Sequence, residues 1–329
     1  MTTRHFLTDL DLEPDELVQV LNLADYMKAS PYEITALAGP QTAAVIFDKT
    51  STRTRFSFAS GIAHLGGQPI IVNPGEAQLG HKESIADTAR VLERQVALII
   101  WRTYAQAGLE EMAEYSRVPV INALSDDYHP CQLLADLQAV REQLGSLEGR
   151  TLAYLGDAAN NMANSYLLAG VNAGMNVRIA GPEGYLPSER IVAAAQARAQ
   201  RTGAQITITT SPEEAVAGAD VVATDTWVSM GQEEEKEQRL RLFGDYQVNA
   251  GLMEHAAEGA VVLHCLPAYR GAEITSEVLD GPQSVIWDEA ENRLHAQKAV
   301  MAWLLVQSGR ADEATAELVR RGVRGQPAA

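Results

Sequence analysis

Short apolar runs alternate with longer amphipathic segments along almost the whole chain of 329 residues. The runs in the first half are TAAVIF, QPIIVN, VALIIWR and PVINAL, and those in the second half are TLAYLGD, NVRIAGP, QITITT, VVATD, VVLHCLP and SVIWDEA. Segments with helical periodicity, such as SIADTARVLERQ and SERIVAAAQARAQRTG, lie between them. Runs that are apolar throughout are typical of parallel strands covered on both faces, so the pattern predicts an α/β fold.

The two sets of runs predict two doubly wound α/β domains, each a parallel sheet with helices on both faces, and the chain is long enough for both. We expect a first domain at residues 1–145, a second at 146–305, and a C-terminal helix and tail at 306–329. The stretch CQLLADLQAVREQLG should be the connecting helix, because it directly precedes the boundary near GSLEGR. We expect EEEKE to be a solvated helix face and the terminal RGVRGQPAA to be frayed.

Composition narrows the class of protein. The formal net charge is −17, which argues against a general nucleic-acid binder or a surface that docks on anionic lipid. Two cysteines in a chain of this length favour a reduced, cytoplasmic setting rather than a disulfide scaffold. The N-terminus has no apolar signal segment, and no apolar run approaches the length of a membrane span. These features favour a cytoplasmic protein that binds small molecules in local pockets.

Polar residues follow the apolar runs, where open parallel sheets bind their ligands. In the first half STRTR follows TAAVIFD, Arg102 ends VALIIW, and SDDYHPCQ follows PVINAL. In the second half GDAANN follows TLAYL, DTWVSMG follows VVAT, and HCLPAYRG follows VVL. The predicted sites therefore lie at the carboxyl ends of the strands in both domains.

The segment STRTR predicts an anion site. Ser51 and Thr52 stand where a strand gives way to a helix, and the unpaired N–H groups of a helix start attract anions. Arg53 and Arg55 are about 200° apart around a helix, so we assign Arg53 to the anion and Arg55 to a structural partner. The alternative is a hydroxyl helix cap beside two surface arginines. His129 and Gln132 would share one helix face nearby, although a histidine before a proline is also a common turn residue.

Five segments together resemble one family. STRTR, HPCQ, DTWVSMGQE, HCLP and DEAENRLHAQKA occur in the order and spacing of the aspartate/ornithine carbamoyltransferase family, from residue 4 to about residue 306. STRTR alone leaves the aspartate-specific members open, whereas HCLP and the D-x-W-x-S-M-G loop are similar to the ornithine-specific members. The resemblance implies an active site in the cleft between the domains. It also implies transfer of the carbamoyl group of carbamoyl phosphate to the δ-amine of L-ornithine, giving L-citrulline and phosphate in arginine metabolism.

The resemblance also assigns site residues. Those implied for carbamoyl phosphate are Ser51, Thr52, Arg53, Thr54, Arg102, His129, Pro130, Cys131, Gln132 and Arg293, with Gln78 supplied by a neighbouring subunit. Those implied for ornithine are Asn161, Asp225, Ser229, Met230, Cys265 and Leu266. For Asn161 and Asp225 the residues alone leave helix-cap or turn roles open. A homotrimer with active sites near the subunit interfaces is implied as well.

The implied chemistry is attack of the amine on the carbamoyl carbon. Arg102 and His129 would stabilise the oxyanion, and Cys265 or Asp225 would help to remove the amine proton; the sequence leaves open which of them accepts it. We expect no cofactor and no metal. GDAANN lacks the glycines of a dinucleotide site, and adjacent strand residues such as His264 and Cys265 should point to opposite faces.

Three rival functions remain open: a carbamoyltransferase for putrescine, acetylornithine or aspartate, a non-catalytic binder of carbamoyl phosphate, and a dehydrogenase of similar fold. Asp225 and the SMG segment argue against a carbamoyltransferase for another amine. The arginines and Cys265 argue against a non-catalytic binder, and GDAANN argues against a dehydrogenase. One departure concerns Arg55, because Ala59 stands where the family usually carries a glutamate.

Overall fold

The chain forms two compact units in a computed structural model that describes residues 3–76, 83–228 and 233–325. Unit 1 consists of Met1–Gln138 and Glu291–Ala329, and unit 2 of Ala139–Ala290. The expected boundary at residue 145 lies close to the first division. Residues 291–305, which we expected in the second domain, belong instead to unit 1, because the helix that carries them is buried there.

Unit 1 is built on a four-stranded parallel sheet in the order β2-β1-β3-β4. Its strands are β1 (Thr42–Phe47), β2 (Gln68–Val72), β3 (Leu98–Arg102) and β4 (Val120–Leu124). Each lies within a predicted apolar run. The N-terminal segment adds a short bridge at the edge of the sheet, where Phe6 pairs with Ile121 of β4.

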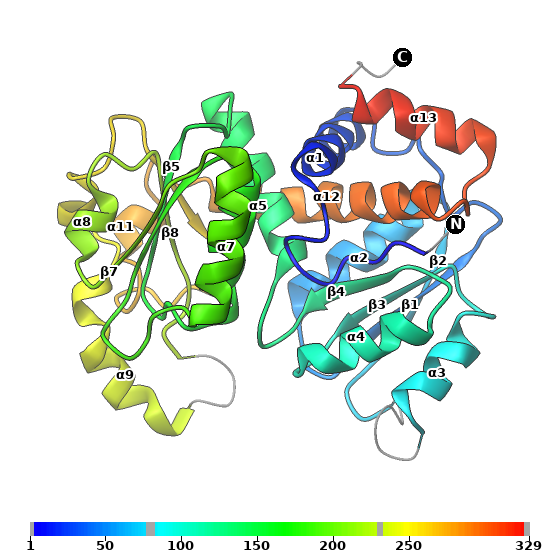
Figure 1. The fold of residues 1–329 in the computed structure, drawn as a ribbon, viewed down its shortest axis with the longest axis horizontal. Coiled ribbons are helices and arrows are strands. Elements are labelled where there is room, and N and C mark those ends of the chain that lie inside the picture. Colours follow the sequence, from blue (N-terminus) through cyan, green and yellow to red (C-terminus); the bar gives the residue numbers. More distant parts are fainter. Residues whose placement is uncertain (1–2, 77–82, 229–232, 326–329) are drawn as a thin grey trace. The chain divides into compact units, whose positions relative to one another are not determined.

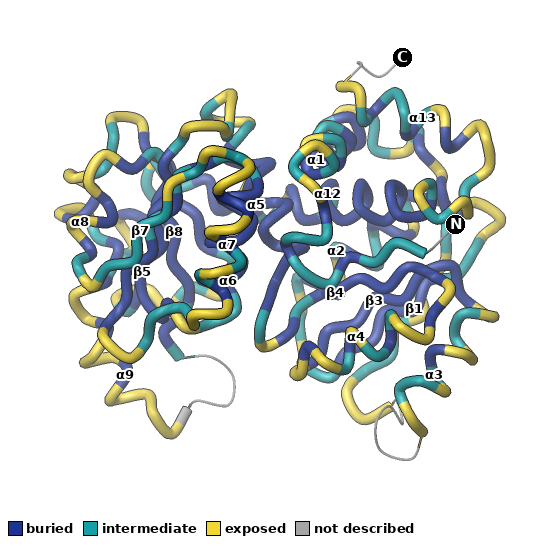
Figure 2. The backbone as a smooth tube through the Cα atoms, viewed as in Figure 1, coloured by how far each residue is buried: buried dark blue, intermediate teal, exposed yellow. Residues whose placement is uncertain are grey.

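Helices cover both faces of this sheet. They are α1 (Pro14–Ala29), α2 (Thr52–His64), α3 (Ile85–Leu92), α4 (Gln106–Tyr115), α12 (Ile286–Gln307) and α13 (Glu313–Val323). Figure 1 shows α3 and α4 on one side of the sheet and α2 and α12 on the other. Figure 2 shows much of α12 coloured as buried, and residues such as Ala299 and Leu304 are fully buried. Because α13 continues to Val323, the first three residues of RGVRGQPAA, a segment that we expected to be frayed, are helical.

Unit 2 has a five-stranded parallel sheet in the order β7-β6-β5-β8-β9. Its strands are β5 (Thr151–Leu155), β6 (Asn176–Ala180), β7 (Ile206–Thr209), β8 (Val221–Thr224) and β9 (Val261–His264). Its helices are α6 (Asn161–Asn172), α7 (Glu189–Thr202), α8 (Pro212–Val216), α9 (Lys236–Leu242), α10 (Ala250–Met253) and α11 (Ser276–Leu279), with short 3-10 turns at Glu233–Glu235 and Gly244–Tyr246. Figure 1 shows α7 and α8 on opposite sides of this sheet. The predicted connecting helix is α5 (Pro130–Leu144), which begins in unit 1 and ends in unit 2.

The run SVIWDEA, interpreted from the sequence as a further apolar strand, is not one. Ser284 forms only an isolated bridge with Val262, and α12 begins two residues later at Ile286. Asp288 and Glu289 occupy the first turn of that helix, where acidic side chains are favoured by the helix dipole. The acidic pair therefore indicates the start of a helix, whereas the apolar residues before it had led us to predict a strand.

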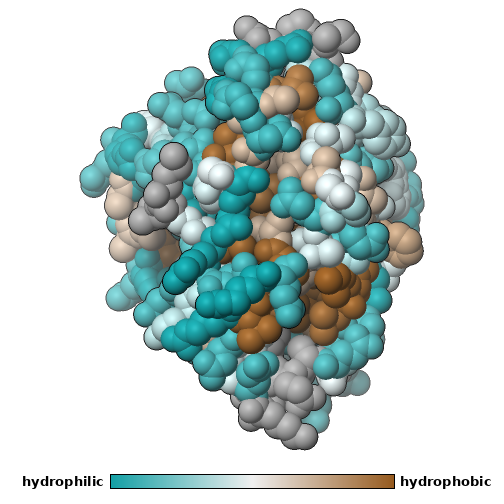
Figure 3. All heavy atoms as spheres, turned by 90° about the vertical axis from the view of Figure 1, so that its right-hand side faces the viewer, coloured by the Kyte–Doolittle hydropathy of each residue, from teal (hydrophilic) through white to brown (hydrophobic). Residues whose placement is uncertain are grey.

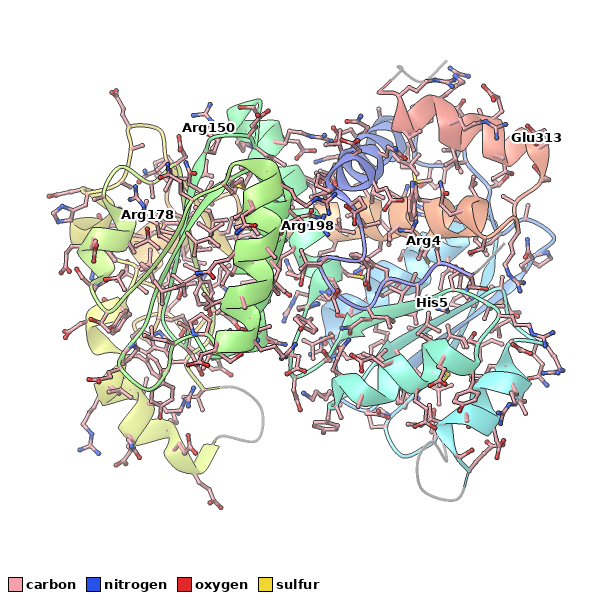
Figure 4. The ribbon with its side chains drawn as sticks, viewed as in Figure 1. Arg4, His5, Arg150, Arg178, Arg198 and Glu313 are labelled. Atoms are coloured by element: carbon pink, nitrogen blue, oxygen red, sulfur yellow. The ribbon has the colours of Figure 1, made fainter. Side chains whose placement is uncertain are left out.

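Buried or half-buried arginines fix the ends of several elements (Figure 4). Arg4 binds both carboxylate oxygens of Glu16 at 2.9 Å and lies over the Trp303 ring, which ties the N-terminal segment to α1 and α12. In unit 2, Arg178 donates to the Ala215 and Ala217 carbonyl oxygens at the end of α8. Such contacts satisfy carbonyl groups that a helix end leaves without partners.

Each sheet has a switch point, where the chain crosses to the other side of its first strand. In unit 1 this point lies between β1 and β3, and in unit 2 between β5 and β8. Open α/β sheets bind ligands beyond the carboxyl ends of the strands at these points. Among the residues that the structure describes, no helix is both long enough and apolar enough to cross a membrane.

Candidate active site

The segment STRTR forms the start of α2, directly after β1. Ser51 caps the helix, and its Oγ accepts a hydrogen bond from the Thr54 N–H at 3.2 Å. The hydroxyl can still donate its own proton to a ligand. Thr52 and Arg53 occupy the first turn, where the N–H groups and the dipole favour an anion. The helix-cap interpretation of Ser51 is thus confirmed, and it is compatible with anion binding.

Arg55 points to a structural partner, as predicted. Its Nη2 donates to Asn73 Oδ1 at 2.5 Å, and its guanidinium lies 5.3 Å from the centre of the Phe47 ring. Asn73 is itself held, because its Nδ2 donates to Glu76 Oε2 at 2.9 Å. Asn73 and Phe47 therefore hold Arg55 in a chain that carries Ala59 at the position of the usual glutamate.

Arg102 and His129 lie in the interior of unit 1 and are 8% and 4% exposed. The pairing of β3 with β4 shifts between Trp101 and Arg102, and such irregularities often redirect a side chain beside a site. Burial holds the pKa of His129 well below its ordinary value, and the charges of Arg293, Arg102 and Arg53 lower this pKa further. The imidazole is therefore neutral at pH 7 and surrounded by three guanidinium groups.

A chain of hydrogen bonds links three predicted residues of unit 1. Arg293 on α12 donates from Nη2 to Thr54 Oγ1 at 2.6 Å and from Nη1 to Gln132 Oε1. Gln132 lies in the first turn of α5, which begins at Pro130, a favoured residue at the first helical position. Cys131 turns its thiol to the Asn122 carbonyl at 3.4 Å, and burial raises the pKa of this thiol to about 12. Its side chain is thus an inert part of the interior.

In unit 2, Asp225 and Cys265 are in contact. Asp225 follows β8 and Cys265 follows β9, and the Cys265 thiol donates to Asp225 Oδ1 at 3.2 Å. Burial raises the pKa of Asp225, while the nearby His264 and the thiol hydrogen bond lower it. A carboxylate of raised pKa is a better proton acceptor than an ordinary aspartate.

A buried histidine shapes the turn that carries Cys265. His264 Nδ1 accepts the N–H of Leu266 at 2.9 Å, so the proton resides on Nε2, which lies 3.1 Å from Glu273 Oε1. The backbone N–H of His264 donates to Glu289 Oε2 at 2.9 Å. Leu266 has a φ of 59°, a left-handed conformation that is unfavourable for a leucine. The contacts of His264 hold this turn in place and fix the position of Cys265.

We expected His264 and Cys265 to point to opposite faces of a strand, which would keep them from binding one metal ion, and this expectation is wrong. Ligand atoms of Asp225, His264 and Cys265 lie within 4.8 Å of one another, because β9 ends at His264 and the chain turns there. Both ring nitrogens of His264 are already engaged, however, by Leu266 and Glu273. A metal ion would have to displace one of these contacts, so proximity alone does not make a metal site.

Asn161 is the first residue of α6, but its neighbour Asn160 is the cap and accepts the Ala163 N–H at 2.8 Å. The helix-cap role left open for Asn161 thus belongs to Asn160. Gly156, at the end of β5, has a φ of 121°, and a side chain there would approach Trp227 to 3.0 Å. This glycine is required by close packing within unit 2 rather than by a dinucleotide.

Arg239, in α9, joins the loops that follow β5 and β8. It is 3% exposed, donates to the Trp227 carbonyl at 2.5 Å, and forms an ion pair with Asp157. Its guanidinium lies 5.2 Å from the centres of the Tyr185 and Phe243 rings. The loops that carry Asn161 and Asp225 are therefore connected through one buried cation.

Three predicted site residues, Gln78, Ser229 and Met230, lie outside the described residues. Conversely, several buried charged residues next to the site were missed: Asp136, Asp157, Arg239, His264, Glu273 and Glu289. Asp157 lies in GDAANN, Glu289 in DEAENRLHAQKA and His264 in HCLP, but only His264 was considered for a role, as a metal ligand. The ion pair between Arg239 and Asp157 and the contact between His264 and Glu289 join residues that are remote in sequence.

Two family profiles match the chain. The aspartate/ornithine carbamoyltransferase carbamoyl-P binding domain matches residues 4–142, and the Asp/Orn binding domain matches residues 148–304. Among curated relatives, the ornithine carbamoyltransferase of Renibacterium salmoninarum is 65% identical over 93% of this chain and 100% of that protein. The enzyme of the same name from Clavibacter michiganensis is 64% identical, again over 93% of this chain and 100% of its own length.

Solved structures show the same similarity. The ornithine carbamoyltransferase from Pyrococcus furiosus has a TM-score of 0.87 at 45% identity and covers 92% of this chain and 96% of its own. The anabolic ornithine carbamoyltransferase from Campylobacter jejuni has a TM-score of 0.87 at 39% identity and covers 93% of this chain and 100% of its own. Fold and sequence similarity thus extend over both units.

Proposed function

The chain belongs to the aspartate/ornithine carbamoyltransferase family, and we propose that it acts as an ornithine carbamoyltransferase. The reaction transfers the carbamoyl group of carbamoyl phosphate to the δ-amine of L-ornithine and releases L-citrulline and phosphate. The observation that carries this proposal is that unit 1 contains a cationic group of side chains and unit 2 contains an acidic one. These groups match a phosphorylated substrate and an amino acid.

Carbamoyl phosphate is the substrate assigned to unit 1. The α2 start with Ser51, Thr52 and Arg53 would hold the phosphate through N–H groups, hydroxyls and a guanidinium. Thr54, Arg293 and Gln132 form one hydrogen-bonded chain beside it. Gln78 and the backbone of Pro130 and Cys131 complete the proposed set. Neutral His129 and Arg102 would hydrogen-bond the carbamoyl oxygen.

Ornithine is assigned to unit 2. The Asp225 carboxylate suits the α-ammonium, and the Asn161 amide suits the α-carboxylate. The further proposed contacts are Ser229, Met230, Cys265 and Leu266. The Cys265 thiol, held against Asp225, would lie beside the reacting amine and guide it.

The chemical step requires an unprotonated δ-amine, although a free alkyl amine titrates near 10.4 by analogy with lysine. Attack on the carbamoyl carbon gives a tetrahedral oxyanion, which donors from His129 and Arg102 would stabilise. Phosphate then leaves into the positive surroundings of Arg53. The amine proton passes toward the Cys265–Asp225 pair.

Three further assignments are part of the proposal. A homotrimer is supported by apolar side chains exposed on unit 1, such as Phe56 at 66% and Ile70 at 46%. Figure 3 shows hydrophobic residues gathered among hydrophilic ones on one face of the molecule. A cytoplasmic location is supported by two free cysteines, and a role in arginine synthesis by the anabolic relative named above.

A citrulline assay with a panel of amines tests the function. With carbamoyl phosphate present, we expect turnover with L-ornithine and a kcat/KM about 10⁴–10⁵-fold lower with putrescine. Putrescine lacks the groups that would pair with Asp225 and Asn161, and buried polar groups left unpaired give such discrimination. Lysine, acetylornithine and aspartate serve as further controls. Preference for any other amine of the panel would overturn the assignment to ornithine.

A further inference from the structure

We propose that Asp136 is a specificity-determining residue that makes the site recognise the NH₂ group of carbamoyl phosphate. It acts by fixing the orientation of the Gln132 side-chain amide. This inference rests on the proposed function, and it concerns a residue that the sequence motifs do not single out. Asp136 lies one turn after Gln132 on α5 and is 1% exposed.

Two partners together determine the orientation of this amide. Gln132 Nε2 lies 2.8 Å from Asp136 Oδ1, and a carboxylate only accepts. Gln132 Oε1 lies against Arg293 Nη1, and a guanidinium only donates. The amide therefore directs its N–H₂ group to Asp136 and its oxygen to the side occupied by Arg293 and Thr54.

The direction of that oxygen has a chemical consequence. Carbamoyl phosphate differs from acetyl phosphate in carrying NH₂, a donor, where acetyl phosphate carries a methyl group. An amide oxygen in the site accepts a hydrogen bond from NH₂ and gains nothing from a methyl group. If the amide were reversed, its N–H₂ group would face the NH₂ group of the substrate, and two donors cannot form a hydrogen bond with each other. The contact with Asp136 thus orients Gln132 so that its amide oxygen accepts a hydrogen bond from the carbamoyl nitrogen.

The arrangement is buried, which makes it specific. Gln132 is fully buried and Arg293 is 3% exposed, so a group that loses its partner here is not readily compensated by water. Without the Asp136 carboxylate, the amide N–H₂ loses this acceptor, and Gln132 loses one of the two contacts that fix its orientation. Its Oε1 is then held less firmly toward the carbamoyl group.

The test is the ratio of two dissociation constants, measured by titrating acetyl phosphate and carbamoyl phosphate into the full-length protein without amine. We expect the wild type to prefer carbamoyl phosphate by about tenfold, which is the value of one buried hydrogen bond. In Asp136→Leu this preference should fall to within about twofold of unity, while the affinity for inorganic phosphate stays within about threefold of the wild type. Asp136→Asn, whose oxygen can still accept, should keep most of the preference.

Asp25→Leu is the matched control. Gln138, on the same helix, donates from Nε2 to Asp25 Oδ1 at 3.0 Å, so this variant deletes the same kind of bond elsewhere in unit 1. Its ligand preference should equal that of the wild type. Because a ratio of affinities does not depend on the fraction of folded protein, partial misfolding of Asp136→Leu leaves the test valid.

The outcomes separate the two proposals. A wild type that binds carbamoyl phosphate no more tightly than inorganic phosphate would overturn the proposed function itself. A wild type that prefers carbamoyl over acetyl phosphate, with the same preference in Asp136→Leu, would overturn only the role of Asp136. Loss of preference in Asp25→Leu as well would show that any damage to unit 1 has this effect, and would also count against Asp136.

Discussion

The two units share one architecture but carry opposite electrostatic groups at corresponding places. Each is a parallel sheet with a switch point beside its first strand. In unit 1 the side chains near that point are cationic or neutral donors, with Arg53, Arg102 and Arg293 around a neutral His129. In unit 2 the loops after β8 and β9 bring Asp225 to Cys265.

The difference shows that the fold supplies the position of a site and the loop residues supply its charge. The pKa directions follow from this division. In unit 1, burial and positive neighbours lower the pKa of His129, whereas in unit 2 burial raises the pKa of Asp225 and of Asp157. A phosphate is therefore suited to the first environment and an ammonium group to the second.

The largest effect should come from removing the anion contact of unit 1. Arg53→Gln should lower kcat/KM for citrulline formation about 10³–10⁴-fold, because a forked, charge-assisted contact to phosphate is lost. Arg55→Gln is the matched control, since Arg55 binds Asn73 and the Phe47 ring, and it should cost less than about tenfold. Equal losses in the two variants would contradict the assignment of Arg53.

The second effect is on the stability of unit 2. Arg239→Met should lower the free energy of unfolding by about 3–5 kcal/mol, because it leaves the buried Asp157 carboxylate without its cation. Combining it with Asp157→Leu should restore most of the loss. Arg270→Met, which breaks an exposed pair with Asp280, should leave the free energy of unfolding close to that of the wild type. Urea unfolding monitors all three variants, and a double variant no better than Arg239→Met alone would contradict this interpretation.

The third effect distinguishes recognition from proton transfer in unit 2. If Asp225 binds the α-ammonium, Asp225→Ala should lower kcat/KM for ornithine about 10²-fold and that for putrescine less than about tenfold. Putrescine has no α-ammonium group, so the variant removes no such contact from it and its kcat/KM should change little. Equal losses for the two amines would show that Asp225 acts in proton transfer or folding instead.

The smallest effect concerns pH and unit 1. Burial, with Lys298 and Lys28 nearby, lowers the pKa of His295 from 6.5 to about 4. Below pH 6.5 the unfolded chain therefore binds a proton that the folded chain does not, so stability is full above pH 6.5 and falls as pH drops toward 4. His295→Gln should reduce the loss between pH 7.5 and 5 by about 1–2 kcal/mol in urea unfolding. An unchanged loss would show that His295 does not titrate differently in the two states.

Much of the fold was predictable because buried parallel strands are apolar throughout, and all nine strands in the described residues lie within predicted runs. The run SVIWDEA shows the limit of this signal, since apolar residues before an acidic helix start look the same as a strand. Arg55 could be separated from Arg53 by helix geometry alone. Arg239 could not be identified, because its partner Asp157 is remote in sequence and is brought to it by the fold. Asp136 lies one turn from its partner Gln132, but the sequence does not show that this face of the helix is buried.

The central claim is that the two units divide the substrates between them. It is tested most directly by titrating carbamoyl phosphate, without amine, into the wild type, Arg53→Gln and Asp225→Asn. We predict that Asp225→Asn binds within about twofold of the wild type, whereas Arg53→Gln loses at least about 100-fold in affinity. A comparable loss in both variants, or none in Arg53→Gln, would contradict the division.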